Sequence, residues 1–197
     1  MECLFGITGK DFVLLAADKL VARSIVVMKS DELKLKRLNN QTVMAYAGES
    51  GDATNFAEYI QRNISLYTIR NDDRQLSPKA VATFVRNQLA ESLRTRSPYN
   101  VNILIGGCDV NGGGSPQLFW IDYLGSMVQV PYGVHGYGSY FCTATLDRHW
   151  QPDMNLEQAV EVLKKCFAEL KTRFIVNIKE YSVQVIRNTG SIETITF

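Results

Sequence analysis

The first residues of the chain raise the question of whether an enzyme here uses its own first residue as a nucleophile. The opening stretch MECLFGITGKDFVLLAADK reads as a strand, a tight turn and a second strand that ends on the carboxylate of Asp18. Cys3 and Thr8 carry a thiol and a hydroxyl, the groups that such enzymes activate. To become terminal, Cys3 would have to lose the two residues before it, and Thr8 the seven before it. Both cleavages would sacrifice strand pairing, so we expect both residues to be structural.

The histidines and glycines do not form a pattern typical of a metal or nucleotide site. His135 and His149 are the two histidines, and no cysteine or carboxylate accompanies them at ligand spacing. The run GVHGYGSY lacks the GxGxxG spacing that follows a parallel strand in dinucleotide-binding folds. We therefore expect no cofactor and no metal, and we interpret His135 as a hydrogen-bonded turn residue.

Charge and hydropathy exclude several classes of partner. The chain has 21 Lys and Arg residues and 20 Asp and Glu residues, for a net charge of +1, and neither sign forms a long block. We expect no nucleic acid and no anionic membrane as partners. An apolar run of about 18 residues and a signal-peptide pattern are also missing. The sequence therefore predicts no membrane span and no secretion.

The four cysteines predict reduced thiols rather than disulfides. Cys3, Cys108, Cys142 and Cys166 are separated by 105, 34 and 24 residues, which matches neither a CxxC pair nor a compact disulfide framework. Free cysteine is among the residues most often buried. We expect four reduced, mostly buried thiols in an intracellular protein.

The elements that must position these residues begin with strands. ECLFGIT and FVLLAAD flank a polar turn, and IVVM and TVMAYAG follow, which predicts an antiparallel sheet. From Asp52, the expected N-cap, apolar residues recur at helical spacing. The predicted buried stripe consists of Ala53, Phe56, Ala57, Ile60, Ile64 and Tyr67.

The rest of the chain alternates between helices and strands. Ser77-Pro78 predicts the start of a second helix that runs toward Arg96, and Asn155 with Gln158 predicts a capping box for a strong later helix. SYFCTATLDRHW is interpreted as a short helix. Strands are expected in VNILIGGCD, QLFWID, SMVQV, YSVQVIR and SIETITF.

This order of elements predicts the fold class. Residues 1–197 contain no internal repeat and no linker long enough to separate domains, so we expect a single domain. Strands joined by hairpins do not make parallel βαβ units. Two antiparallel sheets packed face to face, with helices on both outer faces, satisfy the requirement for packed layers. The sequence therefore predicts an α+β protein with a four-layer α-β-β-α sandwich.

Five motifs together resemble a known family. The alternating first strand, the hairpin after it, AADK, the YAGESGD turn into a helix and HGYGS before another helix look like a proteasome β subunit, and the resemblance covers the whole chain. It implies the N-terminal nucleophile hydrolase fold. In catalytic members of that family, the hydroxyl of a first-residue threonine attacks the peptide carbonyl and a free α-amine acts as base.

The resemblance also implies roles for three residues of this chain. Asp18 matches the aspartate that orients a lysine, Lys34 matches that lysine, and Gly48 matches the glycine whose N–H donates to an oxyanion. A structural interpretation competes with this one. Asp18 and Lys34 would persist as a buried ion pair, and Gly48 would fit a tight turn with a backbone angle that glycine accepts easily. We favour the structural interpretation of the pair.

The nucleophile of the family is missing. Alignment through Asp18 places the threonine at Glu2, which has no nucleophilic hydroxyl, and we expect no propeptide before it. Tyr137 replaces a supporting serine, and Phe174 and Asn177 lie near the positions of the aspartate and serine that support the amine. The resemblance therefore implies a subunit without catalytic residues. The alternative is an active hydrolase subunit with unusual N-terminal processing.

Further segments indicate a place within the family. FAEYIQRNISLY, RTRSPYNVNILIGGCD, HGYGSYF, LDRHW and CFAELKTRFIVNI are similar to the non-catalytic subunit at the fourth position of the β ring. The resemblance implies two neighbouring β subunits in a heptameric ring, contacts with the α ring and the opposite β ring, and a cytoplasmic and nuclear location. A free-standing binding module on the same sandwich is a second alternative.

Overall fold

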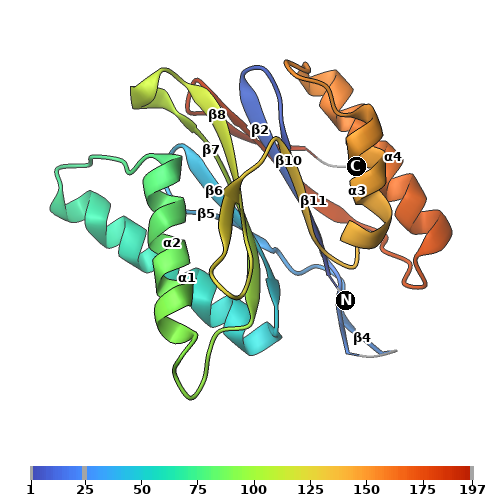
Figure 1. Ribbon diagram of the computed structural model, residues 1–197, viewed down its shortest axis with the longest axis horizontal. Coiled ribbons are helices and arrows are strands. Elements are labelled where there is room, and N and C mark those ends of the chain that lie inside the picture. Colours follow the sequence, from blue (N-terminus) through green and yellow to red (C-terminus); the bar gives the residue numbers. More distant parts are fainter. Residues whose placement is uncertain (1, 24–25, 196–197) are drawn as a thin grey trace.

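The structure is a computed structural model that describes residues 2–23 and 26–195. Two antiparallel sheets pack face to face at its centre, with one pair of helices on each outer face (Figure 1). This arrangement is the four-layer sandwich that the order of elements predicts. Among the described residues, the structure has no helix that is both long and apolar enough to cross a membrane.

The first sheet has the strand order β10-β1-β2-β11-β12. Its strands are β1 (Cys3–Thr8), β2 (Phe12–Asp18), β10 (Tyr132–Gly136), β11 (Tyr181–Arg187) and β12 (Ile192–Ile195). Helices α3 (Ser139–His149) and α4 (Leu156–Arg173) cover its outer face. Strand β1 lies inside this sheet, between β10 and β2, so its removal would leave β10 without a partner strand and β2 with β11 alone.

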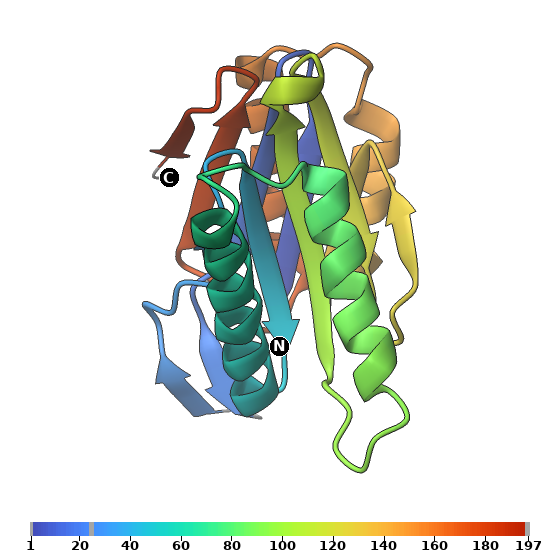
Figure 2. The ribbon, with the colours of Figure 1, turned by 90° about the vertical axis from the view of Figure 1, so that its left-hand side faces the viewer.

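The second sheet has the strand order β5-β6-β7-β8-β9. Its strands are β5 (Leu35–Arg37), β6 (Thr42–Gly48), β7 (Val101–Asp109), β8 (Ser115–Ile121) and β9 (Met127–Gln129), with a 3₁₀ turn at Val110–Gly112. Helices α1 (Ser50–Arg70) and α2 (Pro78–Ser92) lie across its outer face (Figure 2). Outside both sheets, β3 (Val21–Arg23) and β4 (Val26–Lys29) pair with each other.

Both faces of β1 and β2 are buried, which explains why their sequences are apolar throughout. Along β2, Leu14 and Ala16 pack toward α3 and α4, whereas Val13 and Leu15 pack between the two sheets. Side chains that alternate in direction along a strand here meet an apolar layer on either side. The continuous run FVLLAA therefore reflects a central strand of a layered fold.

Two predicted helix caps are confirmed and one is wrong. Ser77 Oγ accepts a hydrogen bond from the Ala80 N–H at 3.3 Å, and Asn155 and Gln158 form a complete capping box. Helix α1, however, begins at Ser50 after the N-cap Glu49. Asp52 instead lies in its first turn, where the carboxylate accepts a hydrogen bond from the Asn100 N–H at 3.3 Å.

Other predictions are corrected by the described residues. Tyr67, placed on the buried stripe of the first helix, is 40% exposed, and Figure 1 shows that the last turns of α1 stand away from the second sheet. His135 lies in strand β10 rather than in a turn. Ile25 of the predicted strand IVVM and the last two residues of SIETITF lie outside the described residues. The four cysteines are free and buried, as expected.

Candidate functional site

Four elements bring the candidate residues together at one end of the sandwich. Asp18 is the last residue of β2 and Gly48 the last residue of β6, while Glu2 directly precedes β1 and Lys34 directly precedes β5. The β1-β2 hairpin places Glu2 and Asp18 at the same end of the first sheet. The side chains of Asp18, Lys34 and Glu2 and the backbone of Gly48 then meet through hydrogen bonds and ion pairs, and we call this group the cradle.

Asp18 is the organising residue of the cradle. Its side chain is fully buried, and both carboxylate oxygens accept hydrogen bonds. Oδ1 accepts from the Cys3 N–H at 2.8 Å, and Oδ2 accepts from the Leu20 N–H at 3.0 Å and from Lys34 Nζ at 2.7 Å. Both oxygens of this buried carboxylate therefore have hydrogen-bond donors, which offsets the cost of removing them from water.

Lys34 is held in place by the groups around it. Its Nζ lies 2.7 Å from Asp18 Oδ2 and donates to the Leu20 carbonyl oxygen at 2.7 Å. A second carboxylate oxygen, Oε1 of Glu2, lies 3.4 Å from the same nitrogen. The Lys34 side chain is 3% exposed, so its charge is balanced almost entirely by protein groups.

The carboxylate of Glu2 occupies the position in front of Gly48. Oε2 accepts a hydrogen bond from the Gly48 N–H at 2.6 Å. Burial raises the pKa of the Glu2 carboxyl above its usual value, and the nearby Asp18 charge adds to this, while Lys34 and the Gly48 N–H lower it. The N–H that the resemblance assigns to an oxyanion therefore already has an anionic acceptor from the chain itself.

Gly48 is required by close packing rather than by its backbone angle. A Cβ atom added at this position would lie 2.1 Å from the carbonyl oxygen of Asn100, and the backbone angle φ is not positive. The prediction that an unusual angle demands glycine here is therefore wrong. The close approach of the chain before β7 leaves no room for a side chain.

An aromatic pair stands where the family would place polar groups that support the amine. The rings of Tyr137 and Phe174 stack with their centroids 5.8 Å apart, and Tyr137 is 50% exposed. The Tyr137 N–H donates to the Glu2 carbonyl oxygen at 3.1 Å. Gly136, with φ of +77°, would bring a Cβ within 1.9 Å of the same oxygen. The sequence analysis missed this backbone contact, which holds Glu2 from the side of β10.

The other two candidate nucleophiles are held in the fold. Cys3 is fully buried, and burial raises the pKa of its thiol to about 12, which disfavours the reactive thiolate. Thr8 pairs with Val13 at the opposite end of the β1-β2 hairpin from Asp18, and its hydroxyl donates to the Pro131 carbonyl oxygen at 2.7 Å. Neither side chain is brought into the cradle.

His135 has a structural environment. It is 4% exposed, its ring stacks on Trp120 with centroids 4.4 Å apart, and its Nε2 lies 3.1 Å from the Ile103 carbonyl oxygen. Burial lowers the pKa of this imidazole to about 4. Within the described part of the chain, no group of three or more His, Cys, Asp or Glu side chains is arranged to hold a metal ion.

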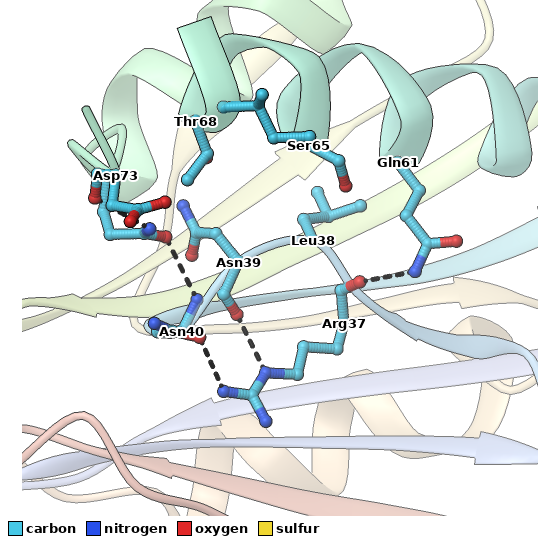
Figure 3. A pocket seen from close by; sticks show the side chains of 10 residues that line it. Arg37, Leu38, Asn39, Asn40, Gln61, Ser65, Thr68 and Asp73 are labelled. Carbon is cyan, nitrogen blue, oxygen red and sulfur yellow. Dashed lines mark hydrogen bonds between the residues drawn. The ribbon is translucent and has the colours of Figure 1, made fainter. Parts of the chain in front are cut away.

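Two pockets lie near the second sheet. One, of about 160 Å³, opens beside the cradle and is lined by Glu2, Lys34 and Tyr46 among others. Another, of about 430 Å³, lies between the β5-β6 turn and the last turns of α1 (Figure 3). In it, Arg37 Nη2 donates to Asn40 Oδ1 at 2.9 Å and Gln61 Nε2 donates to the Arg37 carbonyl oxygen at 2.9 Å. These polar groups mostly bond one another and connect β5 to α1.

Comparison with known proteins decides the family. The proteasome subunit family profile matches residues 2–186. The chain belongs to the proteasome β-subunit family. A probable proteasome subunit beta type-4 from Meyerozyma guilliermondii is 48% identical over 190 residues, which cover 96% of this chain and 97% of that protein. The proteasome subunit beta type-4 of Saccharomyces cerevisiae is 46% identical, over 96% of this chain and 95% of that protein.

A plant relative has a different name. The proteasome subunit beta type-2-B of Arabidopsis thaliana is 40% identical over 193 residues, which cover 98% of this chain and 95% of that protein. Relatives with both names therefore match this proteasome β subunit over nearly their whole lengths.

Proposed function

We propose that this chain is a non-catalytic structural subunit of the 20S proteasome core particle, of the class called beta type-2, at the fourth position of the β ring. It would form part of the wall of the proteolytic chamber and support the neighbouring catalytic subunits during ubiquitin-dependent protein degradation in the cytoplasm and nucleus. Its partners would be two β neighbours in a heptameric ring, subunits of the α ring and subunits of the opposite β ring.

The observation that carries this proposal is the position of Glu2. Catalysis in this family requires a hydroxyl at the first residue, with a free amine beside it. Here the corresponding residue is a glutamate, and its carboxylate accepts the hydrogen bond of the Gly48 N–H at 2.6 Å. A carboxylate in that place lacks the hydroxyl that this family uses for attack, and it opposes the build-up of negative charge on a substrate oxygen.

Exposed apolar side chains support a role within an assembly. Ile175 is 93% exposed, Tyr140 82% and Met28 67%. Exposed apolar patches on soluble proteins commonly mark surfaces that a partner covers. Obligate interfaces are in addition rich in aromatic residues and methionine.

The test is the intact mass of this chain, released under denaturing conditions from particles purified from the native source. We expect the mass of a chain that still carries Glu2, with or without the initiator methionine and with or without an acetyl group. A mass short by two residues or by seven would place Cys3 or Thr8 at the terminus. Either result would favour the alternative of an active hydrolase with unusual processing.

A further inference from the structure

We propose that the Gly48 N–H and the Lys34 ammonium form a carboxylate-binding site that the chain fills with its own Glu2, and that removal of the Glu2 side chain opens this site to an external small carboxylate. The binding site does not depend on the ring position of the subunit, whereas the role given to Glu2 rests on the proposed place of the chain in a proteolytic chamber.

The donors of this site are fixed before any ligand arrives. Gly48 is fixed by its pairing with Val101 across β6 and β7, and the next N–H, that of Glu49, donates to the Asn100 carbonyl oxygen at 3.2 Å. Lys34 Nζ is held by Asp18 Oδ2 and the Leu20 carbonyl oxygen, both at 2.7 Å. Donors that are already in position bind an anion without the entropic cost of ordering them.

The geometry matches the two oxygens of one carboxylate. In the present structure, Oε2 of Glu2 lies 2.6 Å from the Gly48 nitrogen, and Oε1 lies 3.4 Å from Lys34 Nζ. The backbone N–H groups at the start of α1, which begins at Ser50, add positive potential on the same side. A carboxylate that carried its own single charge and two acceptor oxygens would reproduce both contacts.

The surroundings leave room for such a ligand. The pocket of about 160 Å³ beside the cradle has Glu2 itself as one of its walls. Loss of the Glu2 side chain beyond Cβ would join the volume it occupies to this pocket. The opened space would admit an acetate ion, and the carboxylate end of a short peptide has the same chemistry.

The wild-type role of Glu2 follows from this arrangement. A site of this kind inside a compartment where peptides are produced would collect peptide carboxylates. Glu2 is covalently attached, so it competes at an effective concentration far above that of a free ligand. It therefore keeps the site closed, and the chain neither cleaves nor retains peptides there.

The experiment observes the Gly48 amide directly. The chain contains one Ala-Gly pair, Ala47-Gly48, so full-length protein labelled with ¹³C′-alanine and ¹⁵N-glycine gives a single correlated NMR signal from Gly48. Sodium acetate replaces sodium chloride at constant ionic strength, and acetamide serves as the uncharged analogue. The variant is Glu2→Ala, and Glu161→Ala, which removes an exposed carboxylate paired with Lys164, is the matched control.

We expect the Gly48 signal of Glu2→Ala to move away from its wild-type position and to return toward it, with saturation, as acetate is added. Acetamide should produce no such return, and the wild type and Glu161→Ala should not respond to acetate. A Gly48 signal in Glu2→Ala that ignores acetate, or a wild-type signal that responds equally, would overturn the proposal. Neither result would change the mass of the native chain, so the scaffold function is tested independently by that mass.

A second variant keeps the proposal testable if Glu2→Ala does not fold. Glu2→Gln keeps the side-chain volume and one acceptor oxygen, so it should leave the site filled. We expect its Gly48 signal to shift because the acceptor is uncharged, and to remain insensitive to acetate. A Gly48 signal identical to that of the wild type would show that the Glu2 carboxylate does not sit on this N–H.

Discussion

Glu2 has two effects on the cradle: under the proposed function it stands in place of the nucleophile, and its carboxylate occupies the position in front of the Gly48 N–H. One substitution would reverse both effects. Replacement of Glu2 by threonine would supply a hydroxyl and free the Gly48 N–H at the same time. The aromatic pair of Tyr137 and Phe174 would remain, stacked at 5.8 Å where the family has groups that support the amine.

We therefore predict that Glu2→Thr does not create an active subunit. The mass of the variant chain first establishes that Met1 has been removed, so that the introduced threonine is terminal. Particles that contain the variant are then treated with an electrophilic peptide that labels N-terminal threonines, and the mass of this chain is measured again. We expect no adduct on the variant chain, while the catalytic subunits of the same particles are labelled and serve as the internal control. An adduct on the introduced threonine of the Glu2→Thr chain would show that the hydroxyl alone was missing.

The pair of Asp18 and Lys34 is predicted to matter for stability. Lys34→Met keeps an unbranched side chain but leaves Asp18 buried and without its cation, and the loss of one partner typically costs about 3 to 5 kcal/mol. The double variant with Asp18→Asn should lose less than the sum of the two single variants. The measurement is the free energy of unfolding of the full chain in urea.

A matched control uses an exposed ion pair. Lys164 lies 2.8 Å from Glu161, and the two side chains are 52% and 63% exposed. Lys164→Met should change the free energy of unfolding by less than about 1 kcal/mol. Equal decreases in the free energy of unfolding for Lys34→Met and Lys164→Met would contradict the view that burial makes the Asp18-Lys34 pair important for stability.

At the scale of elements, β10 joins the two sheets. Its residue His135 packs on Trp120 of β8 and bonds to the carbonyl oxygen of Ile103 in β7, and the Trp120 indole N–H donates to the Val134 carbonyl oxygen at 3.2 Å. These contacts connect the edge strand of the first sheet to the middle of the second. Burial favours a neutral His135, because a charged imidazole there would lose its hydration, and the hydrogen bond to Ile103 opposes this effect only in part.

We predict that His135 makes the fold sensitive to acid. Burial lowers its pKa from 6.5 to about 4. The unfolded chain therefore binds the proton first, and the stability contributed by neutral His135 is lost as the pH falls from about 6.5 to about 4. The full loss amounts to about 3 kcal/mol, at about 1.4 kcal/mol for each pH unit.

The measurement is the free energy of unfolding as a function of pH between these two values. His135→Gln should flatten this part of the profile, whereas His149→Gln, at the other histidine, should not. The carboxyl of Asp122, which directly follows β8 of the second sheet, attracts a charged imidazole and so raises the pKa of His135, against the effect of burial. A wild-type profile that is flat across the window, or identical in His135→Gln, would refute the prediction.

The sequence predicts well those elements that have a long apolar pattern or a clear capping or turn signal at an end. β2 is an unbroken apolar run that ends on Asp18, and α4 begins with the Asn155 capping box. β3 and β5 contain three residues each and β10 contains five. Segments this short carry too little periodicity to predict, and their strand character comes from partners that are distant in the sequence.

The cradle was predictable in part. The resemblance identified Asp18, Lys34 and Gly48, and the structure brings all three together. The position of the Glu2 carboxylate was not predictable, because it depends on how closely the start of β1 approaches the end of β6. The close approach of Asn100 to Gly48 was not predictable either, although it is the reason that this position requires glycine.

At the scale of the whole molecule, β4 is an exposed apolar edge. Val26, Val27 and Met28 are 55%, 57% and 67% exposed, and β4 pairs only with β3 outside the two main sheets, among the strands that the structure describes. An exposed apolar strand is a site for association with another chain. In the proposed assembly, this strand would be covered by a neighbouring subunit.

We predict that Val27→Ser combined with Met28→Ser impairs assembly without impairing the fold. Surface substitutions usually change the free energy of unfolding by less than about 0.5 kcal/mol. The fraction of the chain that sediments with the large particle, relative to free chain, should fall. The control is Val110→Ser, which changes an exposed apolar residue outside β4 and should assemble normally. Equal incorporation of both variants into the particle would exclude β4 as a contact.

The central place of β1 in its sheet also determines when the domain can be completed during synthesis. β1 leaves the ribosome first, yet one of its partners is β10, with Cys3 opposite Gly136. Strand β2 lacks its second partner strand for even longer, because that partner is β11, where Tyr181 lies opposite Asp18. The N-terminal hairpin therefore remains without its flanking strands until most of the chain has been translated. Such late closure exposes apolar strands for an extended time, so the nascent subunit should depend on chaperones more than a protein built from local contacts.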